Sequence, residues 1–271
     1  MNIVVTGGRG FIGAATVEEL ESRGHEVWTF DRDNGHNVLG DLSMLKGANV
    51  VVHLAGMLGT TELFDQAQQA VAVNVGGTLR ILDWCVENEA SYVGITMPDS
   101  SWANVYQATK LCAMRLATAW HRNFKVGVSH VRAFNAYGPR QKHGLGHPQK
   151  IIPHFATSAW EGKPLTIWGS GNQTVDLIHA DDVAKVLADA VVFTDDEILD
   201  AGTGTAVTVN QVALFVNRVT GNQAGVVHLP MREGEEPDTD IVAHGDGWEA
   251  MGWKPQFSWD RLKETVESYK P

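Results

Sequence analysis

The sequence predicts an α/β fold, in which a parallel sheet with helices on both faces is completed by a smaller C-terminal lobe. Short, almost wholly apolar runs alternate with segments of helical spacing along the first half of the chain. Such runs are typical of strands buried on both faces, and their alternation with helices implies parallel strands joined by right-handed crossovers. A glycine-rich sequence, TGGRGFIG at residues 6–13, separates the first apolar run from the first helical segment. Together these observations predict a doubly wound parallel sheet.

The elements of this sheet follow one another in a regular order. Residues 3–5 form an apolar run that meets glycines at once, and residues 11–23 then show helical spacing, which predicts a strand, a turn and a helix. The same reasoning predicts strands at 25–31, 49–55, 91–96 and 126–131, with helical material over 64–89 and a further helix that begins near residue 106.

The glycine-rich turn has the pattern of a dinucleotide site. Gly7, Gly10 and Gly13 permit a tight turn and close approach of a pyrophosphate, and the following helix presents free N–H groups to the anion. Asp31 ends the next strand, where a carboxylate accepts hydrogen bonds from ribose hydroxyls and repels a 2′-phosphate. Arg32 could take up such a phosphate if it turned inward. The pattern predicts a Rossmann-type sheet that binds NAD in preference to NADP.

The second half of the chain has a different texture. Residues 138–148 resemble a loop, and the later helices, predicted at 149–161, 180–193, 209–219 and 258–269, are separated by short strands and turns. We predict that residues 1–140, with interleaved segments near 176–203, form the NAD-binding Rossmann domain. The remainder of 141–271 forms the smaller, substrate-binding lobe.

Composition narrows the class of protein further. The chain has 271 residues, is 44% hydrophobic and 20% charged, and carries a formal net charge of -11. An acidic surface repels nucleic-acid backbones, and no apolar stretch has the length of a membrane span. Cys85 and Cys112 give no disulfide framework, and no metal-binding spacing or N-terminal targeting pattern is apparent. We expect a cytoplasmic protein with no nucleic-acid partner, no membrane partner and no metal site.

Tyr106 and Lys110 stand four residues apart at the start of a predicted helix. Residues at this spacing share one face of a helix, so the phenol and the ammonium can approach each other. The same spacing occurs in ordinary amphipathic helices. By itself it leaves both a catalytic pair and a structural first turn open.

Further motifs follow in a fixed order along the whole chain. They are Asp41-Leu42, the sequence HLA at 53–55, N-x-x-G-T at 74–78, Y-x-x-x-K at 106–110, R-x-F-N-x-Y-G-P at 132–139, a long segment from IIPHF at 151–155 to DDVA at 181–184, MREGEEPD at 231–238 and MGWKP at 251–255. With the opening TGGRGFIG, they resemble the extended short-chain dehydrogenase/reductase family of nucleotide-sugar epimerases and dehydratases.

The resemblance implies the cofactor contacts. They come from Gly7, Gly10, Phe11, Ile12 and Gly13 in the loop, from Asp31 and Arg32 at the ribose, from Asp41 and Leu42 at the adenine, from Leu54, Ala55 and Gly56 beside the nicotinamide ribose, and from Asn74, Tyr106 and Lys110. Tyr106 would take the sugar hydroxyl proton as the carbonyl forms. Lys110 would hold the ribose and, together with the positive nicotinamide ring, bring the tyrosine pKa toward neutrality.

The resemblance also implies the substrate contacts. A hydroxyl donor beside the tyrosine is expected from Thr96 at a strand end, with Ser100 and Ser101 as alternatives. Asn135 would contact the sugar or a phosphate, and the forked guanidinium of Arg232 would bind the pyrophosphate. Val175 occupies a position where the family often has an arginine.

The motifs favour one reaction among several. Related dehydratases carry Asp-Glu directly after the catalytic threonine, whereas Met97-Pro98 follows Thr96 here. The resemblance therefore implies an NAD-dependent nucleotide-sugar epimerase, acting at C4, in a homodimer. A nucleotide-sugar 4-reductase or 4,6-dehydratase is the alternative within enzymes, and a non-catalytic NAD-binding regulatory protein is the alternative outside them.

Overall fold

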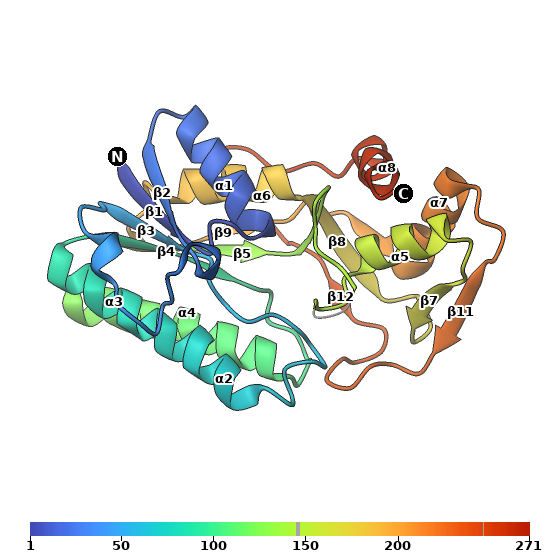
Figure 1. The fold of residues 1–271 in the computed structure, drawn as a ribbon, viewed down its shortest axis with the longest axis horizontal. Helices are drawn as coiled ribbons and strands as arrows, with labels where there is room; N and C mark the ends of the chain where they lie inside the picture. Colours follow the sequence, from blue (N-terminus) through green and yellow to red (C-terminus); the bar gives the residue numbers. More distant parts are fainter. Residues whose placement is uncertain (145–146, 246) are drawn as a thin grey trace.

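The computed structural model describes residues 1–144, 147–245 and 247–271. The described chain is built on a six-stranded parallel sheet with the strand order β2-β1-β3-β4-β5-β9, flanked by helices on both faces (Figure 1). The strands are β1 (Asn2–Thr6), β2 (Glu26–Phe30), β3 (Val50–His53), β4 (Ser91–Thr96), β5 (Val128–Ala133) and β9 (Asp195–Ala201). The strand order reverses at β1, which gives the crossover pattern of a doubly wound sheet. The predicted fold class is confirmed.

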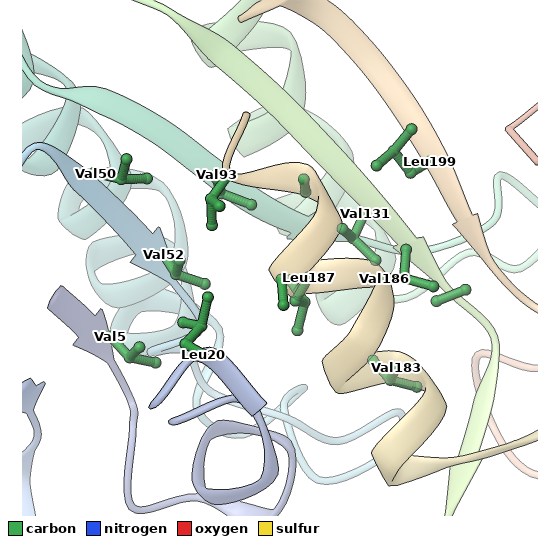
Figure 2. Packing of buried hydrophobic residues seen from close by; sticks show 14 of the residues in the cluster. Val5, Leu20, Val50, Val52, Val93, Val131, Val183, Val186, Leu187 and Leu199 are labelled. Atoms are coloured by element: carbon green, nitrogen blue, oxygen red, sulfur yellow. The ribbon is translucent and has the colours of Figure 1, made fainter. Parts of the chain in front are cut away.

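Alternation along the strands divides the core between the two faces of the sheet. Ile3 and Val5 pack in one cluster with residues of α1 (Phe11–Ser22) and α6 (Ala180–Ala190), several of which are shown in Figure 2. Val4 points the other way, into a cluster with residues of α3 (Gly77–Asn88) and α4 (Val105–Phe124). Because side chains of a strand alternate between faces, an unbroken apolar run covers both.

The predicted helix over 64–89 is interrupted. It consists of α2 (Ala67–Val71), a π-helical turn η3 (Ala72–Gly76) and α3. The π turn carries Asn74, whose side chain bonds the main chain of Met57 in the loop after β3. A π turn inserts one residue into the helix and is frequent at functional sites, and its presence cannot be read from apolar spacing.

The C-terminal lobe lies at one end of the sheet (Figure 1). One of its small sheets joins β6 (Asn135–Tyr137), β8 (Thr174–His179), β10 (Ala206–Thr208) and β12 (Asp240–Ile241); another pairs β7 (Leu165–Trp168) with β11 (Val226–Leu229). Helices α5 (Ile151–Trp160), α7 (Val209–Thr220) and α8 (Trp259–Ser268) pack in a core of their own with these strands. After β8 the chain returns to the main sheet through α6 and β9. The exact domain boundaries stay a prediction.

Two short turns lie in the connection between β2 and β3. They are the 3-10 turns η1 (Arg32–Asn34) and η2 (Ser43–Leu45).

None of the helices in the described ranges is long and apolar enough to cross a membrane.

Candidate active site

The glycine loop forms a cradle that has no room for side chains. Gly7 has φ +69°, and a Cβ added there would lie 2.8 Å from the Ala55 nitrogen. A Cβ on Gly13 would lie 2.1 Å from the Gly7 carbonyl oxygen, and one on Gly10 would lie 3.1 Å from the same oxygen. Among the described residues no side chain caps α1 at Gly10, so its first N–H groups face the loop uncapped. The cradle fits a pyrophosphate.

Asp31 lies at the end of β2 beside this cradle. Its carboxylate accepts the Arg9 N–H at 3.0 Å on one oxygen and the Asp33 N–H at 3.0 Å on the other. Each oxygen keeps a lone pair that can accept a ribose hydroxyl. Arg32 is exposed in the following turn. The structure therefore places Asp31 beside the glycine loop and Arg32 in the exposed turn that follows it, and the ribose contact of both residues stays a prediction.

Asp41 and Leu42, the predicted adenine pair, precede the η2 turn. Asp41 is exposed and accepts hydrogen bonds from the Ser43 main chain at 2.9 Å and the Ser43 hydroxyl at 2.6 Å. These bonds lower the pKa of the Asp41 carboxyl. Leu42 packs partly against the cluster of α3 and α4. The aspartate thus shapes this turn in addition to any contact with adenine.

A buried histidine joins the ends of β1 and β3. Thr6 Oγ1 lies 2.7 Å from His53 Nδ1, and the Ala55 N–H donates to the same hydroxyl oxygen at 3.2 Å. Burial, with a smaller effect of the Lys110 charge, lowers the pKa of His53 to about 3. The imidazole is therefore neutral at physiological pH. The uncharged side chains of Thr6 and His53 thus hold Leu54 and Ala55 in place at the carboxyl end of β3.

Asn74 connects the loop after β3 to the helix that carries the tyrosine. Its Oδ1 accepts the Met57 N–H at 2.7 Å, and its Nδ2 donates to the Met57 carbonyl at 3.0 Å and to Thr109 Oγ1 at 3.0 Å. A Cβ on Gly56 would lie 3.1 Å from Asn74 Oδ1. Asn74 thus fixes the loop that follows Gly56, and its predicted contact with the cofactor is untested.

Tyr106 and Lys110 both lie in the first turns of α4 and are partly buried. Burial raises the pKa of Tyr106 to about 12 and lowers the pKa of Lys110 to about 8. Burial thus outweighs any effect of the lysine on the phenol in the protein by itself. The expected fall of the tyrosine pKa toward neutrality therefore requires the positive nicotinamide ring as well.

The three candidate hydroxyls have different surroundings. Thr96, at the end of β4, is 3% exposed, and its Oγ1 is buried with no hydrogen-bond partner among the described residues. Ser100 Oγ donates to Gln107 Oε1 at 2.7 Å, and Ser101 is exposed. A buried hydroxyl without a partner costs free energy, which a bound sugar oxygen would offset. Of the three, Thr96 fits the predicted donor best.

The substrate end carries charges that balance one another. Arg232 forms an ion pair with Glu235, with Nε 3.2 Å from Oε2 and a second bond through the other guanidinium nitrogen. Lys150, at the start of α5, is partly buried. Burial, aided by the Arg232 charge, lowers its pKa, while the carboxylates of Glu62 and Glu235 oppose that shift. Asn135 lies partly exposed on β6.

Sequence reasoning missed several of these groups. Lys150 and Glu62 belong to no recognisable spacing, because they meet only through the fold. Asn104 caps α4, and an asparagine before a predicted helix is a signal that could have been read. No cluster of three or more potential metal ligands occurs among the residues that the structure describes.

Several known proteins are similar to this chain in sequence or in fold. UDP-N-acetyl-alpha-D-glucosaminuronate decarboxylase of Bacillus cytotoxicus is 26% identical over 319 aligned positions, covering 98% of this chain and 97% of the relative. UDP-glucuronate 4-epimerase of Thermodesulfobacterium geofontis is 27% identical over 238 positions, covering 80% and 71%. The crystal structure of UDP-glucose 4-epimerase from Thermotoga maritima, with UDP-glucose, has a TM-score of 0.89 at 23% identity, covering 100% of this chain and 99% of that chain.

The family model described as NAD dependent epimerase/dehydratase family matches residues 3–198, which is more than half of the chain. The chain therefore belongs to the NAD-dependent epimerase/dehydratase family. This membership confirms the predicted resemblance, the NAD cofactor and the class of enzyme.

Proposed function

We propose that this protein is a nucleotide-sugar epimerase that acts at C4 of the sugar through a transient keto sugar. The observation that carries the proposal is the pair Tyr106 and Lys110 on one face of α4. The buried hydroxyl of Thr96, at the end of β4, supports the proposal as the hydroxyl that such a catalytic site also needs. The relative from Thermodesulfobacterium geofontis, named a UDP-glucuronate 4-epimerase, supports this reaction.

The side chains divide the chemistry between them. Tyr106 Oη removes the proton from the sugar hydroxyl as the carbonyl forms and returns it when the hydroxyl is restored. Lys110 holds the ribose and, with a pKa of about 8, stays mostly charged at neutral pH. Thr96 Oγ1 holds the same sugar oxygen. When bound, NAD would accept the hydride and return it to the opposite face of the sugar, and its positive ring would favour the phenolate.

The alternatives within enzymes need other groups or other products. A 4,6-dehydratase needs an additional acid and base, and the position after Thr96 holds Met97 and Pro98. Asp99 is exposed and accepts a hydrogen bond from Gln107 Nε2 at 3.2 Å. A 4-reductase would use the same residues but consume reduced cofactor. The relative from Bacillus cytotoxicus makes decarboxylation of a uronic acid a further outcome to measure.

We further propose a cytoplasmic homodimer. The outer face of α4 is hollowed where Ala108, Leu111, Cys112 and Leu116 meet, with Asp99 and Arg115 also lining the hollow. A largely apolar hollow on a helix face suits a second copy of the same helix around a two-fold axis. Cys85 and Cys112 are both free thiols, which suits a reducing compartment.

The decisive experiment supplies UDP-glucose, UDP-N-acetylglucosamine, UDP-glucuronate and dTDP-glucose with NAD and identifies the products by NMR. We expect a C4 epimer without net formation of NADH. Tyr106→Phe should lower kcat by about 10³-fold and leave NAD affinity within a factor of two, because it removes only the proton acceptor.

Tyr269→Phe is the matched control, since this phenol lies in the lobe and donates to the Gly138 and Gln141 carbonyls. It should keep full activity. Full activity of Tyr106→Phe would refute the proposed base. Loss of water or carbon dioxide from the sugar would assign a dehydratase or decarboxylase instead, and NAD binding without turnover would support a regulatory protein.

A further inference from the structure

We propose that Asn104 is a positioning residue that couples the substrate loop, defined as residues 231–236, to the helix that carries Tyr106 and Lys110. This inference rests on the proposed function in one respect, because it takes the ligand of the loop to be a nucleotide sugar. Asn104 is 6% exposed and caps α4, where its Oδ1 accepts the Gln107 N–H at 2.9 Å. Its Nδ2 donates to the Gly234 carbonyl at 3.0 Å, across 130 residues of sequence. One amide therefore serves both the helix and the loop.

The loop fits closely against two segments of the Rossmann domain at this point. Gly234 has φ +80°, and a Cβ there would lie 2.9 Å from Asn104 Cβ and 3.1 Å from a ring carbon of Phe64. Only glycine combines this backbone conformation with so close a contact. The loop is therefore held in contact with the start of α4 on one side and with the loop after β3 on the other.

The loop carries the charge that the substrate would meet. Arg232 and Glu235 pair across the turn that contains Gly234, and the Glu235 N–H donates to the Arg232 carbonyl at 3.2 Å. Because these bonds link Arg232 and Glu235 on either side of Gly234, the bond from Asn104 to Gly234 also constrains where the guanidinium lies. Movement of the loop would change the distance between Arg232 and the helix of Tyr106.

The helix side of this contact is anchored as well. Gln107, whose N–H donates to Asn104, is 4% exposed. Its Nε2 donates to the Ser100 carbonyl at 2.7 Å, and its Oε1 accepts the Ser100 hydroxyl at 2.7 Å. The segment before α4 and the first turn of α4 are thus tied together. Because these hydrogen bonds hold the start of the helix in place, the bond from Asn104 constrains the loop rather than the helix.

Asn104→Asp separates the two roles of the amide. Aspartate is as good a helix cap as asparagine, but it lacks the N–H donor for the Gly234 carbonyl. Peptide amides within residues 231–236 should exchange with deuterium about fivefold faster, and those within 105–110 should be unchanged. KM for the nucleotide sugar, or the Kd of UDP, should rise about fivefold with kcat unchanged within a factor of two, as expected when one hydrogen bond that supports binding is lost.

Ser258→Asp is the matched control, because it places a carboxylate at the cap of α8, where the Ser258 hydroxyl accepts only the Arg261 N–H in the described contacts. It should change neither exchange in 231–236 nor KM. Gly234→Ala tests the contact from the loop side, in case Asn104→Asp fails to fold, and should give the same faster exchange and higher KM.

Unchanged exchange in Asn104→Asp or in Gly234→Ala would overturn the coupling, and so would faster exchange with an unchanged KM and Kd. Failure of the proposed function appears differently. It would show as absence of epimerised product in the unaltered protein. The exchange comparison needs no ligand and the Kd of UDP needs no turnover, so together they decide the coupling in either case.

Discussion

The glycine loop and the substrate loop hold their proposed ligands by opposite means. In the glycine loop the position of the backbone is set by missing Cβ atoms and by the neutral pair of Thr6 and His53. The substrate loop also needs one glycine, at position 234, but its geometry depends in addition on the ion pair of Arg232 and Glu235 and on one hydrogen bond from Asn104. The glycine loop therefore tolerates few substitutions, whereas in the substrate loop single side chains can be replaced while the backbone stays the same. This difference suits a family in which one cofactor serves several sugar reactions.

The largest effect is expected at the glycine loop. Gly13→Ala puts a Cβ 2.1 Å from the Gly7 carbonyl oxygen. Gly13 lies within α1, where alanine is otherwise the better helix former, so any loss comes from lack of space. We expect NAD affinity to fall by roughly 30- to 100-fold, or about 2–3 kcal/mol, measured by calorimetric titration.

Gly10→Ala is the graded control for this prediction, because its Cβ would lie 3.1 Å from the same oxygen. It should cost about tenfold or less. Equal losses in the two variants, or unchanged affinity in Gly13→Ala, would show that the space around the loop does not set cofactor affinity.

The next effect tests the charged end. Arg232→Gln removes the guanidinium and leaves Glu235, whose side chain is 8% exposed, without its ion-pair partner. We expect the affinity for UDP to fall about tenfold, since hydrogen bonds to a charged group contribute about 1.5–3 kcal/mol, while NAD affinity stays the same. The dependence of UDP binding on salt should weaken in the variant.

Arg218→Gln, at an exposed position in the last turn of α7, changes the net charge equally and should leave UDP affinity unchanged. If both variants weakened UDP binding to the same extent, the overall charge of the protein rather than Arg232 would be responsible. A parallel loss of NAD affinity in Arg232→Gln would contradict the division of the site into two ends.

The same contrast explains what could be predicted from the sequence. The glycine loop and the alternation of strands and helices follow from local patterns, and the spacing of Tyr106 and Lys110 indicates a shared helix face without reference to the fold. The bond between Asn104 and Gly234 spans 130 residues, and no local pattern encodes such a partner. Burial likewise depends on the whole fold, which is why the sequence named the cation beside Tyr106 but not the rise of its pKa to about 12.

A third effect, on stability rather than on binding, concerns the neutral groups of the cofactor end. His53 is buried against Thr6 and Tyr92, and its pKa is lowered from 6.5 to about 3 by burial and by the nearby Lys110. The folded protein keeps this imidazole neutral, whereas the unfolded chain protonates it below pH 6.5. The unfolded state therefore binds more protons as the pH falls, and the free energy of unfolding decreases by at most about 1.4 kcal/mol per pH unit from this group.

Chemical denaturation between pH 6 and pH 4.5 measures this slope, and His53→Gln should flatten it because glutamine does not titrate. Identical slopes for His53→Gln and the unaltered protein would mean that the imidazole is protonated equally in the folded and unfolded states. A charged group would then stand between β1 and β3 below about pH 6.5, and the contrast between a neutral cofactor end and a charged substrate end would fail at its central residue in that range.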